Sequence, residues 1–272
     1  MKSTSWWIIS SMTVLIWSGV LLYFYASSRI NNYLAPDFRP FVLVGGLGLA
    51  VLGGFTLLTA RNVVGCGHQH ALDDVLHEDD EDAMNPWLIL MCMVLPLVIS
   101  LAWTKDKYSP AALARKGLYD TPSAMNAPFI AASIPTLTLQ DVENTHRRTP
   151  DGFLEFNLLE LFFSTGDPEV QKLIEGLQVE TEGRIIDEKV RNPENKRMRL
   201  YRLFINCCAA DARAVPIALH FDGSLPDFPL NSWIKVAGTI RYLLEEGGIH
   251  PVLFVERIAE SEPPYEESFM RQ

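Results

Sequence analysis

The chain has 272 residues, of which 48% are hydrophobic and 21% are charged, and its formal net charge is −10. Near the N-terminus the charged residues leave three long uncharged segments, at 3–28, 40–60 and 83–104. Each segment is long enough to cross about 30 Å of hydrocarbon as a helix, which excludes a purely soluble enzyme. Neither half of the chain offers a basic surface for phosphates, which argues against a nucleic-acid partner, and four cysteines are too few for a disulfide scaffold.

The first uncharged segment has the position of a secretory signal but not its length. Its apolar part, 6–26, exceeds the roughly 7–15 residues that are usual for the core of a signal peptide. Trp6 and Trp7 stand at one end and Tyr23 and Tyr25 near the other, as aromatic residues do at the two interfaces of a membrane helix. We therefore expect a retained helix rather than a cleaved signal.

Three crossings would make residues 1–104 a transmembrane domain in contact with membrane lipid. The N-terminus and the loop 61–84 then share one side, and everything after residue 105 lies on the other. Two Lys and Arg residues flank the spans on the first side and six on the second, which favours a cytoplasmic C-terminal domain. No span contains Asp, Glu, Lys, Arg or His, so we expect an accessory role rather than a pore or carrier formed by this chain alone.

The second span is rich in glycine. Gly46, Ala50 and Gly54 recur every four residues on one helical face, and such small residues let another helix approach closely. The partner helix is either another span of this chain or a separate subunit.

The loop 61–84 combines acidic residues with metal-binding side chains. It contributes −6 of the net charge and contains the possible ligands Cys66, His68, His70 and His77. Thiolate and imidazole groups suit Zn²⁺ or another divalent transition metal, and the carboxylates would raise the local cation concentration. The alternative is a solvated acidic loop whose histidines are incidental.

Residues 105–150 contain five prolines and few periodic apolar positions, which predicts a linker. In the soluble domain that follows, 151–272, a helical pattern places Phe153, Phe156, Leu159 and Phe163 on one face and ends near Gly166. Asp167 and Pro168 then predict the start of a second helix.

Five short strand patterns follow, at 179–186, 199–206, 215–221, 233–242 and 252–259. Gly183 and Gly238 lie inside two of them, where glycine usually marks a bulge or a tight bend. Five bent strands in roughly 85 residues predict a small closed barrel of the OB type. The expected fold is thus an α-helical membrane domain with three spans plus a C-terminal α+β domain with an OB-like β-barrel.

Three residues at the end of the second strand pattern could bind a metal: Cys207, Cys208 and Asp211. Adjacent residues of a strand point to opposite faces, so the two cysteines can act together only if the strand ends or bulges there. The alternatives are a structural pair with one buried thiol, a metal site completed by Asp211, and a reactive dithiol. His220 and His250 are expected to be solvated, and no catalytic set is evident, which predicts a protein that is not an enzyme.

Much of the chain resembles the YcgQ-type family, bacterial proteins described as subunits of two-component permeases with a C-terminal domain of unknown function. The double-cysteine segment CCAADA is the most specific part of this resemblance. The remaining matches are the glycine-rich second span, the His-rich loop, Ser109 to Gly117, Trp233 to Gly238, and Pro263 to Tyr265. The resemblance implies a larger polytopic permease as partner and a multi-pass protein of the bacterial inner membrane.

The leading hypothesis is an accessory subunit of a membrane permease complex, linked to metal-ion transport or homeostasis. The alternative is a membrane-tethered protein that uses Cys207 and Cys208 for thiol redox chemistry or metal transfer. In either case Cys66 and its neighbours would lie across the membrane from Cys207 and Cys208, because the number of predicted spans between them is odd.

Overall fold

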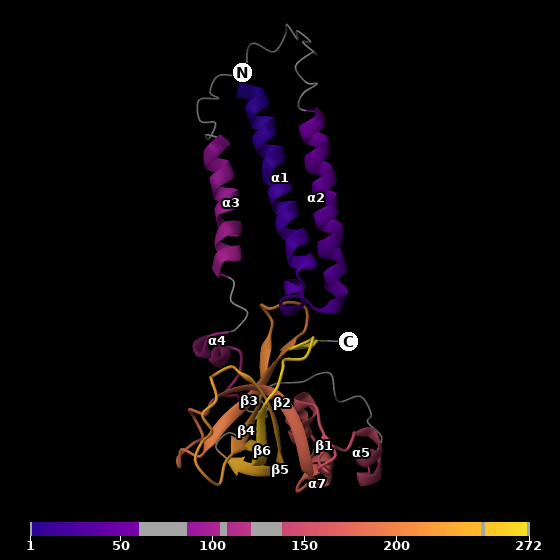
Figure 1. Ribbon diagram of the computed structural model, residues 1–272, viewed down its shortest axis with the longest axis vertical. Helices are drawn as coiled ribbons and strands as arrows, with labels where there is room; N and C mark the ends of the chain where they lie inside the picture. The colour runs from indigo at the N-terminus through magenta and orange to yellow at the C-terminus, as the bar shows by residue number, and fades with distance from the viewer. Residues whose placement is uncertain (1, 60–85, 104–107, 121–137, 246–247, 271–272) are drawn as a thin grey trace. The chain divides into compact units, whose positions relative to one another are not determined.

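The computed structural model describes residues 2–59, 86–103, 108–120, 138–245 and 248–270. The chain forms two compact units, Met1–Asp106 and Lys107–Gln272. The first unit is helical, and the second contains a β-barrel with short helices around it (Figure 1).

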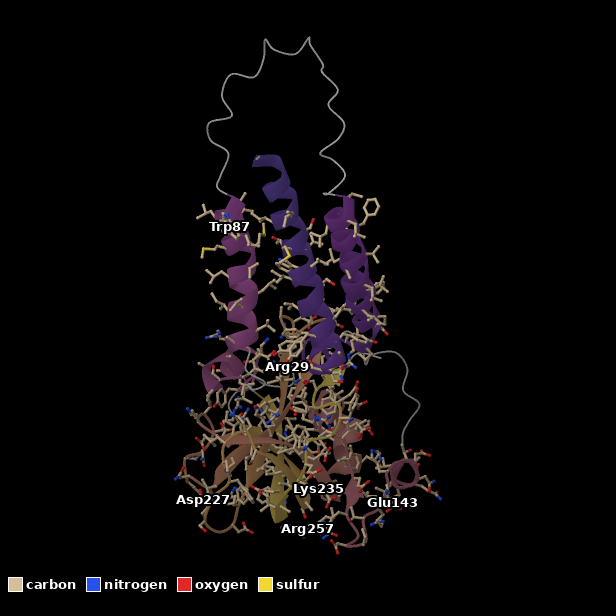
Figure 2. The ribbon with its side chains drawn as sticks, turned by 45° about the horizontal axis from the view of Figure 1, so that its top comes forward. Arg29, Trp87, Glu143, Asp227, Lys235 and Arg257 are labelled. Atoms are coloured by element: carbon tan, nitrogen blue, oxygen red, sulfur yellow. The ribbon has the colours of Figure 1, made fainter. Side chains whose placement is uncertain are left out.

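The first unit consists of α1 (Lys2–Ala26), α2 (Arg39–Thr59) and α3 (Pro86–Trp103). Two 3₁₀ turns, η1 (Arg29–Asn32) and η2 (Pro36–Phe38), connect α1 to α2. α1 packs against both other helices, and α2 runs in the opposite direction to α1 and α3 (Figure 1). Figure 2 places Trp87, at the start of α3, and Arg29 at opposite ends of this unit.

Two of these helices are long and apolar enough to cross a membrane, over Ile8–Ala26 and Pro36–Thr59. The apolar part of α3 that meets the same test of composition, Trp87–Ile99, is shorter. Large apolar side chains such as Phe41, Val51 and Met91 are exposed on α2 and α3, as expected of surfaces that face lipid. Two candidate spans are therefore present, and the third remains a prediction.

The predicted small-residue face of the second span differs from the one in the structure. Gly46 and Gly53, seven residues apart, are the buried glycines of α2. A Cβ atom on Gly46 would lie 2.9 Å from Leu22 Cδ2, and one on Gly53 would lie 2.8 Å from Leu15 Cγ, so α1 occupies the space that side chains would need. A Cβ atom on Gly54 would have nothing within 4 Å, so Gly54 does not take part in the contact with α1.

Polar contacts reinforce the pairing of α1 with α2. Ser18 donates a hydrogen bond from Oγ to the carbonyl oxygen of Gly46 at 2.7 Å, and Ser11 donates one to Thr56 Oγ1 at 2.9 Å. In an apolar surrounding, small residues and such hydrogen bonds hold helices together. The glycine ridge thus packs within the chain, one of the two alternatives expected.

The second unit is built on five strands, β2 (Gln178–Asp187), β3 (Arg197–Ile205), β4 (Arg213–His220), β5 (Trp233–Glu245) and β6 (Gly248–Glu260). Their order is β2-β5-β6-β4-β3, and β3 pairs back with β2, so the sheet closes. β4 and β6 pair in parallel, and the other four pairings of the barrel are antiparallel. The predicted five-stranded barrel is confirmed.

Two further strands lie at the margins of the barrel. β1 (Leu154–Glu155) pairs in parallel with β2, and β7 (Phe269–Met270) pairs in parallel with the last two residues of β3. The interior between the strands is filled by aliphatic side chains, including Val179, Ile185, Leu200, Ile217, Leu219, Ile234, Val236, Ile240 and Leu253.

Both strand glycines stand where the backbone of a neighbouring strand approaches closely. The register of β5 with β6 shifts between Ala237 and Gly238, and a Cβ atom on Gly238 would lie 2.0 Å from the carbonyl oxygen of Phe254. At Gly183 a Cβ atom would lie 2.9 Å from the carbonyl oxygen of Tyr201 on β3. These close approaches need residues without a side chain, and the register shift at Gly238 is one of the irregularities that the sequence predicted.

Four short helices accompany the barrel: α4 (Pro110–Arg115), α5 (Leu139–Thr145), α6 (Leu158–Phe163) and α7 (Pro168–Ile174), with a 3₁₀ turn, η5 (Ser164–Gly166), between the last two. α7 begins as predicted, with the Asp167 side chain accepting hydrogen bonds from the amides of Glu169 and Val170.

The first predicted helix of this unit begins later than expected. Asn157 and Glu160 form a capping box, which starts α6 at Leu158, and Phe153 and Phe156 precede the helix. The residues of α6 that face the core are Leu158, Leu161 and Phe162, not the predicted Leu159 and Phe163. The capping box therefore determines where α6 begins, and the apolar periodicity placed this start about one turn too early.

Part of the predicted linker 105–150 belongs to the barrel unit. Leu113 and Leu118 are fully buried against Ile186, Tyr201 and Ala214. The guanidinium of Arg199 also donates to the carbonyl oxygen of Leu118 while it pairs with Glu188. The segment 108–120 is thus fastened to the barrel wall.

Candidate functional site

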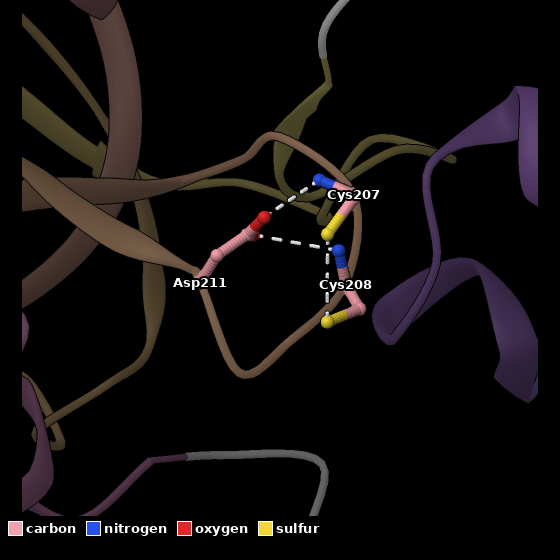
Figure 3. A group of neighbouring side chains, drawn as sticks. All are labelled: Cys207, Cys208 and Asp211. Carbon is pink, nitrogen blue, oxygen red and sulfur yellow. Dashed lines mark hydrogen bonds between the residues drawn. The ribbon is translucent and has the colours of Figure 1, made fainter.

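The loop between β3 and β4 brings Cys207, Cys208 and Asp211 together (Figure 3). β3 ends at Ile205, so the adjacent cysteines are not on a regular strand. The Asp211 carboxylate accepts hydrogen bonds from the amides of Asn206, Cys207 and Cys208 at 3.2, 2.9 and 3.4 Å. One aspartate thereby closes the loop, because its carboxylate accepts from three consecutive N–H groups that precede it in the chain.

The two thiols lie side by side on this loop. Both cysteines are free and half-buried, and the Sγ atoms are 3.7 Å apart. One donor atom from each of Cys207, Cys208 and Asp211 lies within 4.8 Å of the other two. The structure thus places the three residues singled out from the sequence in one cluster that is accessible from solvent.

The two thiols differ in acidity. Hydrogen bonding to Asp211 and then to Cys208 raises the pKa of Cys207 to about 11, because each favours the protonated thiol. Hydrogen bonds from the amide of Ala210, the thiol of Cys207 and the amide of Asp211 lower the pKa of Cys208. Burial raises the pKa of Asp211, but the hydrogen bonds that it accepts outweigh burial and lower this pKa. Cys208 is therefore the more acidic thiol of the pair, and Cys207 is the less acidic one.

A lysine from the segment 108–120 holds the same loop from outside. Lys116 Nζ donates to the carbonyl oxygens of Ala209, Ala210 and Ala212 at 2.9, 3.5 and 3.2 Å. The Tyr108 hydroxyl donates to the carbonyl oxygen of Ala209 at 3.4 Å, and the Lys116 ammonium lies 5.2 Å from the centre of the Tyr108 ring. The Lys116 carbonyl in turn accepts from the amide of Ala214 at 2.8 Å. This lysine fixes the backbone that carries the three donor groups.

Sequence reasoning did not identify Lys116 as part of the site. It counted there only as a positive charge near the membrane, and it is more than 90 residues from the carbonyls that it contacts. Its position inside the Ser109–Gly117 match of the family resemblance was the only indication, and that match assigned it no role.

The other predicted metal ligands lie in the loop 61–84, and two further histidines, His220 and His250, were expected to be solvated. Cys66, His68, His70 and His77 lie outside the described residues. His250 was expected to be solvated, but it lies in β6 with 7% of its surface exposed, because β6 begins earlier than predicted. His220 is half-buried, with its ring 4.8 Å from that of Phe254. Neither histidine belongs to the described metal-ligand cluster.

Comparison with known proteins assigns a family model to the barrel. Residues 170–267 match the model described as the DUF1980 C-terminal domain, which includes all five barrel strands and the cysteine loop. The match supports a DUF1980-type family. No match to a curated protein was found.

Two solved structures are similar over parts of the chain. One is a DUF3299 family protein from Pseudomonas aeruginosa PAO1, with 13% identity, 37% of this chain and 72% of that chain covered, and a TM-score of 0.25. The other is a small single-stranded DNA-binding protein from Streptomyces coelicolor, with 16% identity, 32% and 95% covered, and a TM-score of 0.23. Both scores are too low to relate the fold or the function of these proteins to the chain.

Proposed function

We propose that the chain is a membrane-anchored accessory subunit whose barrel domain binds a thiophilic divalent cation at Cys207, Cys208 and Asp211 and passes it on. The observation that carries this proposal is the clustering of two thiols and one carboxylate within 4.8 Å on a single loop. Thiolate and carboxylate ligands together suit a borderline-soft ion such as Zn²⁺. Cys208, the more acidic thiol, would lose its proton first, and the cation would displace the proton of Cys207 on binding.

The number of donors favours transfer over a structural role. Structural zinc sites usually have four protein ligands, whereas this loop offers three. A site with one position open can exchange its cation with another ligand. The half-buried thiols leave such a ligand access from solvent.

The same geometry disfavours a redox function for the cysteine pair. The Cα atoms of neighbouring residues are about 3.8 Å apart across a trans peptide. The Cα atoms of disulfide-bonded residues are usually about 4.4–6.8 Å apart. Oxidation of Cys207 and Cys208 would therefore distort the loop, whereas metal binding uses the two thiols where they are.

The membrane anchor and the partner extend this proposal. We interpret the helical unit as three spans, with α3 as the third, and the barrel as OB-like, because its strand order combines one parallel pairing with four antiparallel ones. The YcgQ-type resemblance supports a multi-pass protein of the inner membrane and a larger permease as partner, and the Lys and Arg residues beside the spans support a cytoplasmic barrel. The His-rich loop would then collect cations on the opposite side.

Cobalt titration tests the metal site, because thiolate ligands give Co²⁺ a characteristic ultraviolet absorption. The full chain in detergent should carry Cys66→Ser, so that the other predicted cysteine ligand does not contribute. We expect thiolate absorption in this background, its loss in C207S/C208S, and weaker binding in D211N. Asp222→Asn, a change at an aspartate that is 96% exposed, is the matched control. Equal absorption with and without Cys207 and Cys208 would contradict the proposal.

Purification in mild detergent tests the accessory role. We expect a polytopic membrane protein to be isolated with the chain at a constant ratio. A solitary chain, purified from cells that express its genomic neighbours, would count against a permease complex and leave the metal site as a separate question.

A further inference from the structure

A polar cleft of about 450 Å³ lies beside the cysteine loop, entirely within the barrel unit. One wall comes from α4 and the turn after it, with Arg115, Lys116 and Asp120. The other wall comes from the end of the loop and the start of β4, with Asp211 and Arg213. Its volume falls in the range of small-molecule sites, roughly 300–1,000 Å³, rather than that of a single ion.

The cleft is lined by three cationic side chains, Arg115, Lys116 and Arg213, and by two carboxylates, Asp120 and Asp211, so its formal net charge of +1 favours an anion. Lys116 is engaged by three carbonyl oxygens, and the Asp211 carboxylate by three amides. Arg115 and Arg213 are exposed, and among the described residues neither guanidinium has an ion-pair partner.

Other arginines of the barrel unit provide the contrast. Each of four pairs with a glutamate of the same unit, namely Arg184, Arg197, Arg199 and Arg257. Two guanidinium groups on facing walls are therefore available for a ligand. Guanidinium groups bind carboxylates in bidentate geometry.

The cleft and the proposed metal site share Asp211. A cation held by Cys207, Cys208 and Asp211 has one coordination position that the loop does not fill. A ligand seated in the cleft is next to that position, and its negative charge would balance the cation. We propose that the cleft binds a small polycarboxylate chelator, the ligand with which the cation arrives or leaves.

The role of the ligand as a carrier of the cation rests on the proposed function. Binding of the anion to the cleft can be measured without metal. The probe is radiolabelled citrate in equilibrium dialysis against the full chain in detergent, after removal of metal on a chelating resin. We expect saturable binding that weakens by about tenfold or more in R115Q/R213Q, since each guanidinium contributes charge-assisted hydrogen bonds. The charge-matched control is R147Q/K172Q, which changes two exposed cations away from the cleft and should bind as the wild type does.

Two comparisons separate this inference from the proposed metal site. C207S/C208S should retain citrate binding without metal, and R115Q/R213Q should retain the cobalt absorption without citrate. If cobalt absorption is absent but citrate binding still depends on the two arginines, the proposed function fails and the anion site stands.

Two results would overturn the inference. One is equal citrate binding by the wild type and R115Q/R213Q, provided that the variant has the wild-type thermal unfolding midpoint. The other is competition by inorganic phosphate at the same concentration as citrate, which would indicate a general phosphate site instead of a polycarboxylate site.

Discussion

Two cationic side chains join the segment 108–120 to the barrel, and they do so in different surroundings. Arg199 donates to the carbonyl oxygen of Leu118 and pairs with Glu188, with side chains 4% and 0% exposed. Lys116 donates to carbonyl oxygens of the half-buried cysteine loop. The first contact is closed, with both charges paired and hydrogen-bonded. The second holds a loop whose thiols and carboxylate still face solvent.

This difference separates a structural fastening from a site that can bind a ligand. Buried charges are tolerated only when partners satisfy them, and removal of one partner leaves an expensive unpaired charge. Groups on an exposed loop have no such constraint and can retain free coordination capacity. The predictions below test whether the two regions divide stability and binding in this way.

The largest expected effect is loss of stability when the buried pair is broken. Glu188→Ala should lower the free energy of unfolding of the full chain by about 3–5 kcal/mol, because Arg199 remains buried without its counter-ion. Denaturant unfolding in detergent, followed by tryptophan fluorescence, measures this change. Glu143→Ala, which breaks the exposed pair with Arg148, is the control and should cost less than about 1 kcal/mol. A similar loss in both variants would remove the distinction.

The second expected effect is a large difference in thiol reactivity within the cysteine loop. Cys207, with its pKa raised to about 11 from an ordinary 9.0, should be alkylated about a hundredfold more slowly than a normal cysteine near neutral pH. Cys208 should react faster than Cys207, because its pKa is lowered. Iodoacetamide labelling of C208S and C207S, read by peptide mass spectrometry, compares the two. Equal rates from neutral pH to about pH 9 would contradict the assigned roles.

The third expected effect concerns Lys116 as a residue that positions the loop. Lys116→Met should weaken cobalt binding by about tenfold, as loss of outer support does at other metal sites, without a large change in stability. Lys172→Met, at an exposed lysine of α7, is the control. The readout is the cobalt titration in the Cys66→Ser background without citrate. Unchanged affinity with a strongly lowered unfolding midpoint would assign Lys116 to the structural fastening instead.

The smallest expected effect is a pH dependence of stability from Glu188. Burial raises the pKa of this carboxyl, but Arg199 and the amides of Val190 and Arg191 outweigh burial and bring it below the ordinary 4.5. The stabilisation is therefore complete above pH 4.5 and is lost as pH falls through the lowered folded value. The slope from this one proton is at most about 1.4 kcal/mol per pH unit. Acid titration of stability should give a shallower curve for Glu188→Gln, and parallel curves would contradict this contribution.

Local sequence patterns predicted the five-stranded barrel, and they singled out three residues that the structure brings together. Alternating residues such as Ile234, Val236 and Ile240 face the core as expected, and Gly238 marks a bulge. Cys207, Cys208 and Asp211 meet because they are within five residues of one another and the strand before them ends. Contacts set by neighbours in the chain are readable from spacing alone.

Contacts between distant segments were not predictable in this way. Lys116 and the cysteine loop, and Arg199 and Leu118, are brought together only when the barrel closes. Gly53 rather than Gly54 faces α1, because the orientation of a helix depends on its neighbours and not on its own glycines. The late start of α6 is a different case, because it follows from a local signal. Asn157 and Glu160 have the spacing of a capping box, which indicates a helix that begins at Leu158.

The small strand β7 has a practical consequence. Its residues Phe269 and Met270 pair with Phe204 and Ile205, directly before the cysteine loop. The backbone of Met270 therefore runs beside Ile205, the last strand residue before the loop that carries the thiols. A polyhistidine tag placed next to this strand would bring six imidazole groups to a candidate cation site and would compete for the ion being measured. Affinity handles for these experiments belong away from this strand, or must be cleaved before titration.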